Sequence, residues 1–233
     1  MASGSAAKFL QQQFKKLQSD PVEGFAVELP DESNLFEWRI YAEGPKDTFY
    51  QGGVFQLKMN FPEDFPMSPP ELRFISEFWH PNVYEDGKVC ISILHPPGED
   101  EMSGELPEER WLPTQTVATV LLSTISLLSD PNFSSPANVD ASVQWRRDVE
   151  NFKKKCRALV EKSLLEFDGH IKIPHPDTDP EERAKAVQKM KELNKPMDFY
   201  DDFDEFEDYE DFDEDYGDDD DGFDEEEEEE EDD

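Results

Sequence analysis

Hydrophobic residues recur along the first third of the chain with two different periods. In residues 5–19, apolar side chains return every three or four positions, which predicts an amphipathic helix that ends at Asp20-Pro21. Four runs of alternating apolar and polar residues follow, near 25–29, 36–40, 55–61 and 72–75. Because Gly, Pro and Asn separate these runs, we expect a four-stranded antiparallel meander with one buried face.

The second half of the chain returns to helical spacing. Its apolar residues predict one helix with Thr114 as N-cap, which Asp130-Pro131 ends. A shorter helix is expected over 139–145, and a longer one over 149–164 with Cys156 on its apolar face, a position typical of a core thiol. Helices that follow a run of strands indicate an α+β fold.

The candidate chemistry lies in residues 80–93, HPNVYEDGKVCISI. Cys90 follows Asn82 by eight residues, and a Glu-Asp-Gly turn folds the segment back between them. A thiolate attacks acyl groups, and a nearby amide N–H can stabilise the oxyanion that forms. No second Cys and no clear His base accompany Cys90 in this stretch, which disfavours a protease.

Two irregular segments flank this chemistry. Four prolines within nine residues exclude regular structure from the loop FPEDFPMSPP at 61–70, from which we expect Met67 to protrude. The segment 95–110 is acidic and rich in Pro and Gly, so we expect a mobile loop that buries little. Its acids are Glu99, Asp100, Glu101, Glu105, Glu108 and Glu109.

The net charge of −36 is concentrated at one end of the chain. Residues 196–233 hold 26 of the 58 Asp and Glu residues and no Lys or Arg, which leaves 32 acids and 22 bases, a net charge of −10, for residues 1–195. Such acidity disfavours binding to nucleic-acid phosphates and favours basic protein partners.

We expect the tail at 198–233 to be disordered, because it combines self-repelling charge with no aliphatic residues. Aromatic residues recur in it every three positions, at Phe203, Phe206, Tyr209 and Phe212. These aromatic residues are suited to anchor the tail on a basic partner. A purely solubilising tail is the alternative. Before the tail, residues 169–197 form an extension with a helix predicted near 180–193.

Several other chemistries are excluded by the sequence. It has no Cys/His cluster for zinc, no calcium loop with an acid at its first position and no Gly-rich phosphate loop, so we expect neither metal nor cofactor. Two Cys make no disulfide framework, and there is no apolar signal region or run of about 18 apolar residues. We expect a soluble cytoplasmic or nuclear protein that binds neither membranes nor nucleic acid.

The order of these features resembles the ubiquitin-conjugating enzymes over about residues 5–165. The resemblance implies their fold, with a catalytic domain that we assign to 5–168. It implies that Cys90 accepts ubiquitin from an activating enzyme as a thioester and passes it to a lysine, usually with a RING-type ligase bound. Asn82 matches the family residue that stabilises the oxyanion or orders the active-site loop, and His80 matches a structural position.

The resemblance also implies contact surfaces. Three segments match those that bind the ligase: the proline-rich loop, the residues after Trp111, and the basic face of the first helix, which the activating enzyme shares. Their residues are Met67, Leu112, Pro113, Lys8, Lys15 and Lys16.

Two serines, Ser92 and Ser135, depart from the commonest family pattern. Many members have acids there that orient and deprotonate the incoming lysine. With the acidic insert and tail, the serines resemble the branch that serves cullin-RING ligases and builds polyubiquitin chains, its tail docking on a basic cullin surface. We then expect an insert acid near Cys90, such as Glu105, Glu108 or Glu109, to assist the lysine.

Three alternatives remain open at the level of sequence. A conjugating enzyme for another ubiquitin-like modifier would share these motifs. A catalytically silent, ubiquitin-binding adaptor on the same fold usually lacks the Cys. An acidic-tailed chaperone for basic proteins such as histones accounts for the tail but not for Cys90 and its surroundings.

Overall fold

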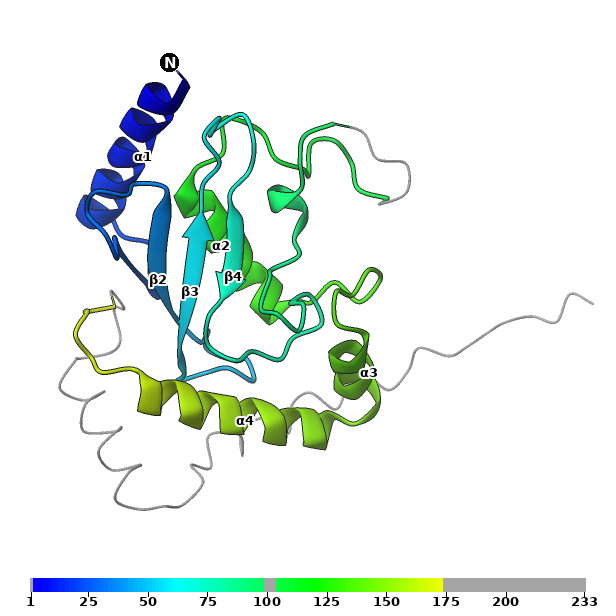
Figure 1. Ribbon diagram of the computed structural model, residues 1–233. Helices are drawn as coiled ribbons and strands as arrows, with labels where there is room; N and C mark the ends of the chain where they lie inside the picture. The colour runs from blue at the N-terminus through cyan, green and yellow to red at the C-terminus, as the bar shows by residue number, and fades with distance from the viewer. Residues whose placement is uncertain (1, 99–103, 174–233) are drawn as a thin grey trace, which may run out of the picture. The chain divides into compact units, whose positions relative to one another are not determined.

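The computed structural model describes residues 2–98 and 104–173 (Figure 1). The described residues all belong to one compact unit. Its elements are α1 (Ala2–Ser19), β1 (Phe25–Glu28), β2 (Glu37–Glu43), β3 (Val54–Asn60), β4 (Glu71–Phe74), the short 3₁₀ helix η1 (Ser92–Leu94), α2 (Val117–Ser129), α3 (Val139–Arg147) and α4 (Val149–Glu166).

The four strands form one antiparallel sheet in the order β1-β2-β3-β4. Ile40 pairs with Val27 on one side and with Leu57 on the other, and Leu57 pairs with Phe74. Ile40 and Leu57 are fully buried, whereas the polar residues beside them, Arg39, Gln56 and Lys58, are half-buried. The predicted meander is therefore confirmed, and burial alternates along β3 and β4 but not along β1 or the second half of β2.

Helices complete the core around this sheet. α2 lies behind the strands in Figure 1, and α4 crosses below them. The ring of Phe14 on α1 lies 5.2 Å from the ring of Trp38 on β2. Ser163 Oγ on α4 accepts a hydrogen bond from the N–H of Val54 at 3.1 Å. Cys156 on α4 is fully buried, as predicted, and burial raises the pKa of its thiol.

α2 begins two residues later than we predicted, because Thr116 rather than Thr114 caps it. The Thr116 side chain accepts a hydrogen bond from the N–H of Thr119, and the Thr119 side chain accepts one from the N–H of Thr116. This reciprocal pair is a capping box. Thr114 lies instead in a turn, in which the N–H of Gln115 donates to the carbonyl of Leu112.

The insert is packed where it joins the domain, so the expectation that it buries little is wrong at that end. Trp111 is fully buried, and its Nε1–H donates to the carbonyl of Pro66 at 2.8 Å. Arg110 is 8% exposed, and the Glu105 side chain is 16% exposed. Burial of the Trp111 indole, whose N–H requires a hydrogen-bond partner, holds the end of the acidic segment against the domain.

Several predictions fall outside the described residues. They concern Glu99, Asp100, Glu101, the helix near 180–193 and the aromatic residues of the tail. Within the described ranges, no helix has the length and apolar character needed to cross a membrane. Those ranges also hold no group of three or more His, Cys, Asp or Glu residues that could bind a metal ion.

Candidate active site

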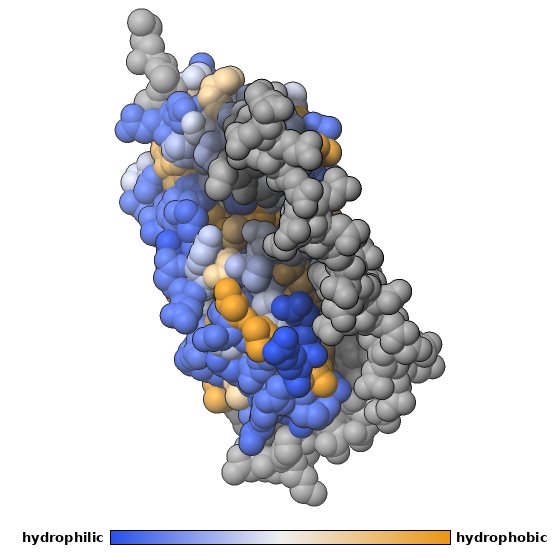
Figure 2. Space-filling view, turned by 90° about the vertical axis from the view of Figure 1, so that its right-hand side faces the viewer, coloured by the Kyte–Doolittle hydropathy of each residue, from blue (hydrophilic) through white to orange (hydrophobic). Residues whose placement is uncertain are grey.

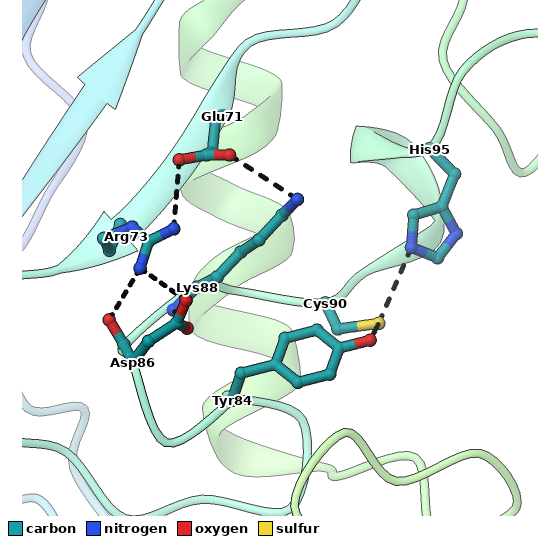
Figure 3. Close-up of polar contacts among 7 residues, drawn as sticks. All are labelled: Glu71, Arg73, Tyr84, Asp86, Lys88, Cys90 and His95. Atoms are coloured by element: carbon teal, nitrogen blue, oxygen red, sulfur yellow. Dashed lines mark hydrogen bonds and ion pairs between the residues drawn. The ribbon is translucent and has the colours of Figure 1, made fainter.

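Cys90 lies half-buried at the end of the segment that follows β4. Its Sγ is 3.9 Å from the hydroxyl of Tyr84 and 3.6 Å from Nε2 of His95 (Figure 3). The N–H of Cys90 donates to the carbonyl of Asn82 at 2.9 Å. The thiol is therefore fixed through its backbone and lies between a phenol and an imidazole.

His80 supports the backbone beneath this thiol. The side chain is fully buried, with Nε2 3.0 Å from the carbonyl of Leu127, while Nδ1 accepts a hydrogen bond from the N–H of Asn82 at 2.9 Å. These partners require a neutral ring with the proton on Nε2. Burial lowers the pKa of His80 to about 3, against a smaller opposing effect of the Leu127 carbonyl. The geometry suits a scaffold residue and not a base.

Asn82 connects the same segment to the loop between α2 and α3. Its Nδ2 donates to the carbonyl of Asn132 at 2.8 Å, and its Oδ1 accepts from the N–H of Asn132 at 2.8 Å. Asn82 is 2% exposed. Because both ends of the amide are engaged, the geometry favours the loop-ordering role over the oxyanion role.

The turn that separates Tyr84 from Cys90 is held by β4. Arg73 lies 2.7 Å from the Asp86 carboxylate and donates to its carbonyl at 2.9 Å, and Glu71 pairs with Lys88 at 3.5 Å (Figure 3). The ion pairs hold the Tyr84 side of the site against the sheet.

Gly87 is required inside this turn. Its φ is +87°, a region that L side chains rarely adopt, and a Cβ there would meet the carbonyl oxygen of Phe74 at 2.2 Å. The N–H of Gly87 donates to the carbonyl of Tyr84 at 2.8 Å. The turn can therefore approach β4 closely only with glycine at this position.

His95 is the neighbour of Cys90 that sequence analysis missed. Its Nδ1 lies 2.8 Å from both carboxylate oxygens of Glu105, which also accepts a hydrogen bond from the Ser92 hydroxyl at 2.8 Å. Arg110 lies 3.8 Å from the same carboxylate. Residues 80–93 contain no His base for Cys90, as the sequence indicated. His95 lies just beyond that stretch, and η1 turns the chain so that its ring faces the thiol.

The charge states of this cluster follow from burial and its hydrogen bonds. Burial raises the pKa of the Cys90 thiol, and Glu105 raises it further, while Tyr84 and Lys88 act in the opposite direction. Burial also acts to raise the pKa of Glu105, but hydrogen bonds from His95 and Ser92 outweigh it and lower that pKa overall. At neutral pH the site therefore holds a thiol, and it holds a carboxylate behind the imidazole.

The structure brings together some of the predicted site residues and leaves others apart. Glu105 reaches the cluster around Cys90, whereas Glu108 and Glu109 are exposed, and Glu109 accepts a hydrogen bond from Leu106 N–H within its own turn. Ser135 is exposed, and its N–H lies 3.3 Å from Oδ1 of Asn132, the residue that Asn82 holds.

The predicted contact residues are available at the surface. Met67 is 59% exposed, as expected, and Leu112 is 39% exposed. The hydrogen bond from Trp111 to Pro66 joins the two loops that carry them. Pro113 is half-buried, and the lysines of α1 are exposed, namely Lys8, Lys15 and Lys16.

Comparisons with known proteins agree on one family. The family model described as ubiquitin-conjugating enzyme matches residues 9–160. Ubiquitin-conjugating enzyme E2 7 of Arabidopsis thaliana is 54% identical over 167 residues, which cover 72% of this chain and 100% of the relative. Ubiquitin-conjugating enzyme E2 15 of Schizosaccharomyces pombe is 47% identical over 164 residues, covering 70% of this chain and 98% of the relative.

A solved structure of human ubiquitin-conjugating enzyme E2 G1 is 48% identical, covers 54% of this chain and 96% of its own, and has a TM-score of 0.48. The family match covers the second half of α1, the sheet and the Cys90 segment. Relatives of about 50% identity are named ubiquitin-conjugating enzymes, which disfavours the non-catalytic adaptor and the chaperone. The chain belongs to the ubiquitin-conjugating enzyme family.

Proposed function

We propose that Cys90 carries ubiquitin as a thioester and that the enzyme transfers it to lysines with a cullin-RING ligase, building polyubiquitin chains. The observation that carries this proposal is the half-buried thiol 3.6 Å from His95, whose other ring nitrogen lies 2.8 Å from Glu105. Family members work with ubiquitin, an activating enzyme and ligases. The proposed partners are the same three.

Loading begins with a thiol that has to lose its proton. An ionised Glu105 can only accept hydrogen bonds, so a neutral His95 bonded to it carries its proton on Nδ1 and turns an unprotonated Nε2 toward Cys90. The Cys90 sulfur attacks the carbonyl of the activating enzyme's ubiquitin thioester, and its proton passes to Nε2 of His95. The new S–C bond forms as the bond to the activating enzyme's sulfur breaks, and that sulfur leaves as a thiolate that takes up a proton.

Transfer uses the same groups. The neutral lysine amine attacks the thioester carbonyl, a C–N bond forms, and the C–S bond to Cys90 breaks. His95, backed by Glu105, accepts the amine proton, and help of this kind contributes a factor of about 10²–10⁴ in rate. Met67, Leu112 and the α1 lysines would meet the ligase.

The cullin-RING assignment rests on Ser92, the acidic insert and the tail. Ser92 stands where many family members have an acid, and here its hydroxyl instead holds Glu105 from the insert. This contact supports the idea that an insert acid replaces the missing one. We assign residues 5–168 to the catalytic domain, and we propose that the tail at 198–233 docks on a basic cullin surface through its aromatics.

A loading assay tests the central proposal. The full chain is incubated with activating enzyme, ubiquitin and ATP, and products are compared with and without reductant. We expect a reductant-sensitive adduct that is lost in Cys90→Ala and retained in Cys156→Ala. An adduct with a different ubiquitin-like modifier, and none with ubiquitin, would reassign the modifier.

The tail is tested separately. Chain formation with a cullin-RING ligase is measured for the full chain and for a form that stops at residue 197, at low and high salt. We expect the truncation to slow the reaction at low salt and the difference to shrink at high salt, because exposed charges are screened. Equal rates at low salt would exclude the docking role.

The free thiols of Cys90 and Cys156 support a cytoplasmic or nuclear location.

A further inference from the structure

A short segment that follows α4 lies against the sheet and has no part in the chemistry proposed for Cys90. It comprises residues 167–173, the yellow segment beyond α4 in Figure 1, and we call it the strap. Phe167 ends α4, its N–H donating to the carbonyl of Ser163 at 3.0 Å, and Gly169 follows with a φ of +75°. Glycine adopts this conformation at little cost, so the chain can turn there.

The strap covers an aromatic residue of the sheet. Tyr41 follows the core residue Ile40 on β2, so its side chain lies on the opposite, outer face of the sheet. The ring of Phe167 lies 5.6 Å from the Tyr41 ring, and the ring of His170 lies 5.2 Å from it. Tyr41 is 1% exposed. The strap therefore buries a ring on a face of the sheet that is otherwise polar.

Apolar side chains are not covered in this way everywhere on the domain. Figure 2 looks onto the side of the molecule on which α3 lies in Figure 1, and it shows hydrophobic side chains among strongly hydrophilic ones there. Val139 of α3 is 61% exposed. Because single apolar residues are tolerated at a protein surface, the position of the strap depends on specific contacts around Tyr41.

His170 fastens the strap with both nitrogens of its ring. Nε2 lies 3.1 Å from the carboxylate of Glu28 on β1, and Nδ1 contacts the carboxylate of Asp168 within the strap. An ionised carboxylate only accepts hydrogen bonds, and a neutral imidazole has a single N–H. Both contacts are therefore satisfied only when the ring is an imidazolium.

Glu28 is fixed in the sheet where it meets this cation. One of its carboxylate oxygens accepts a hydrogen bond from the Tyr41 hydroxyl at 3.0 Å and lies 3.5 Å from Arg39, while the other faces His170. Asp168 instead belongs to the strap and also accepts a hydrogen bond from the N–H of His170 at 3.0 Å. The ion pair with Glu28 is thus the contact through which the His170 ring joins the strap to the sheet.

Beyond His170 the strap is loosely held. In the part of the chain that the structure describes, no backbone hydrogen bond joins residues 169–173 to a strand. Ile171 and Lys172 line an open groove of about 470 Å³ against β1 and the end of α1, and Ile173 is 4% exposed. The strap can therefore leave the sheet without breaking any strand pairing.

The charges around His170 determine the pH range in which this contact is stable. Hydrogen bonds to Asp168 and to Glu28 raise the pKa of His170 above its ordinary value of 6.5, against a smaller effect of burial. Tyr41 is the titratable group that β2 adds, and Arg39 lies behind Glu28. Because the folded pKa is raised, the docked strap is fully stabilised below pH 6.5 and loses this contribution as pH rises through the folded pKa.

We propose that His170 is the latch of a pH-sensitive strap, in which the imidazolium ring holds residues 167–173 over Tyr41 and loss of its proton releases them from the sheet. The proton passes to solvent, since the His170 side chain is 42% exposed. A ring nitrogen without hydrogen then faces a carboxylate, and that repulsion opens the latch. Release uncovers the Tyr41 ring and lets the start of the extension at 169–197 move away from β1. This inference does not depend on the role of Cys90.

Isoleucine-methyl NMR of the full chain tests the latch between pH 5.5 and pH 9. The methyl signals of Ile171 and Ile173 report on the strap, and the ring signals of His170 give its titration in the same sample. Ile75, an exposed residue after β4, is the internal control.

Four variants separate the latch from other effects of pH. His170→Asn is never charged, and His170→Arg is charged throughout this range. Glu28→Gln keeps an oxygen acceptor but removes the negative charge. Glu32→Gln is the matched control, because Glu32 is an exposed acid in the loop before β2.

We expect the ratio of released to docked strap to rise about fivefold between pH 5.5 and pH 9 in the wild type and in Glu32→Gln, with the midpoint of His170 itself, above pH 6.5. His170→Asn should show the high ratio at every pH, and His170→Arg the low one. In Glu28→Gln the rise should fall below about twofold. Strap signals that stay constant while His170 titrates, or that keep their pH dependence in His170→Asn, would overturn the proposal.

Discussion

Sγ of Cys90 lies 3.6 Å from Nε2 of His95, and the opposite nitrogen of the same ring lies 2.8 Å from Glu105. Thiol, imidazole and carboxylate thus follow one another in a line, as in other sites that activate a nucleophile through a neighbouring base. The imidazole and the carboxylate both come from the segment 95–110, which contacts the sulfur through His95 and holds that ring through Glu105.

The first prediction concerns the Cys90–His95–Glu105 arrangement. His95→Gln should slow single-turnover transfer to lysine by about 10²-fold, and Glu105→Gln by about tenfold, because one removes the proton acceptor and the other only its orientation. Rates of loading and of discharge are measured separately in both variants.

Glu108→Gln is the matched control, since Glu108 is an exposed acid of the same insert, and its transfer rate should stay within about twofold of wild type. If transfer by Glu105→Gln also stayed within about twofold of wild type, the insert would not act on the lysine.

The second prediction concerns the ionisation of Cys90. Because burial raises the pKa of this thiol above the ordinary value of 9.0, its alkylation rate should rise about tenfold per pH unit and reach its midpoint above pH 9. Tyr84→Phe should move the midpoint up, since the phenol lowers the pKa, and Glu105→Gln should move it down. Mass spectrometry separates Cys90 from the buried Cys156. Shifts of the same sign in both variants would contradict the assignment.

The third prediction links His80 to stability. The folded pKa is about 3, below the ordinary value of 6.5, so the unfolded chain binds the proton first as pH falls. This contribution is complete above pH 6.5 and is lost from there toward pH 3. Urea unfolding should therefore show about 2 kcal/mol lower stability at pH 5 than at pH 7.

The comparison is made in a His170→Asn background. Hydrogen bonds to Asp168 and Glu28 raise the pKa of His170, so that residue stabilises the fold at low pH and would mask part of the effect. A stability that stays constant between pH 7 and pH 5 in this background would mean that His80 is protonated in the folded protein.

The fourth prediction separates the two roles of Asn82. Asn82→Ala removes both hydrogen bonds to Asn132 and should lower the free energy of unfolding by about 1–3 kcal/mol. Thermal unfolding and transfer rates are measured together. A variant with slow transfer and an unchanged melting temperature would favour the oxyanion role instead.

Much of the fold follows from periodicity alone. Three of the strands, α3 and α4 lie within two residues of their predicted bounds, whereas β2 extends three residues beyond its predicted end, to Glu43. α2 differs at its start, because Thr116 rather than the predicted Thr114 caps it and Thr114 lies in the turn at Leu112.

The site was less predictable than the fold. Cys90, Asn82 and His80 stand in one motif, whereas His95 and Glu105 lie in a segment whose composition indicates a loop. Their contact depends on η1 and on the burial of Trp111, and neither leaves a periodic signal in the sequence. Composition describes the average behaviour of a segment and does not identify the single acid that turns inward.

Trp111 has a mechanical consequence. Its indole N–H is bonded to the carbonyl of Pro66, next to exposed Met67, and its backbone N–H is bonded to the carbonyl of His95 at 3.0 Å. One rigid side chain therefore connects the outer loop to the backbone of the residue that faces Cys90. A displacement of the proline-rich loop is therefore transmitted to the backbone of His95 through two hydrogen bonds and one buried residue.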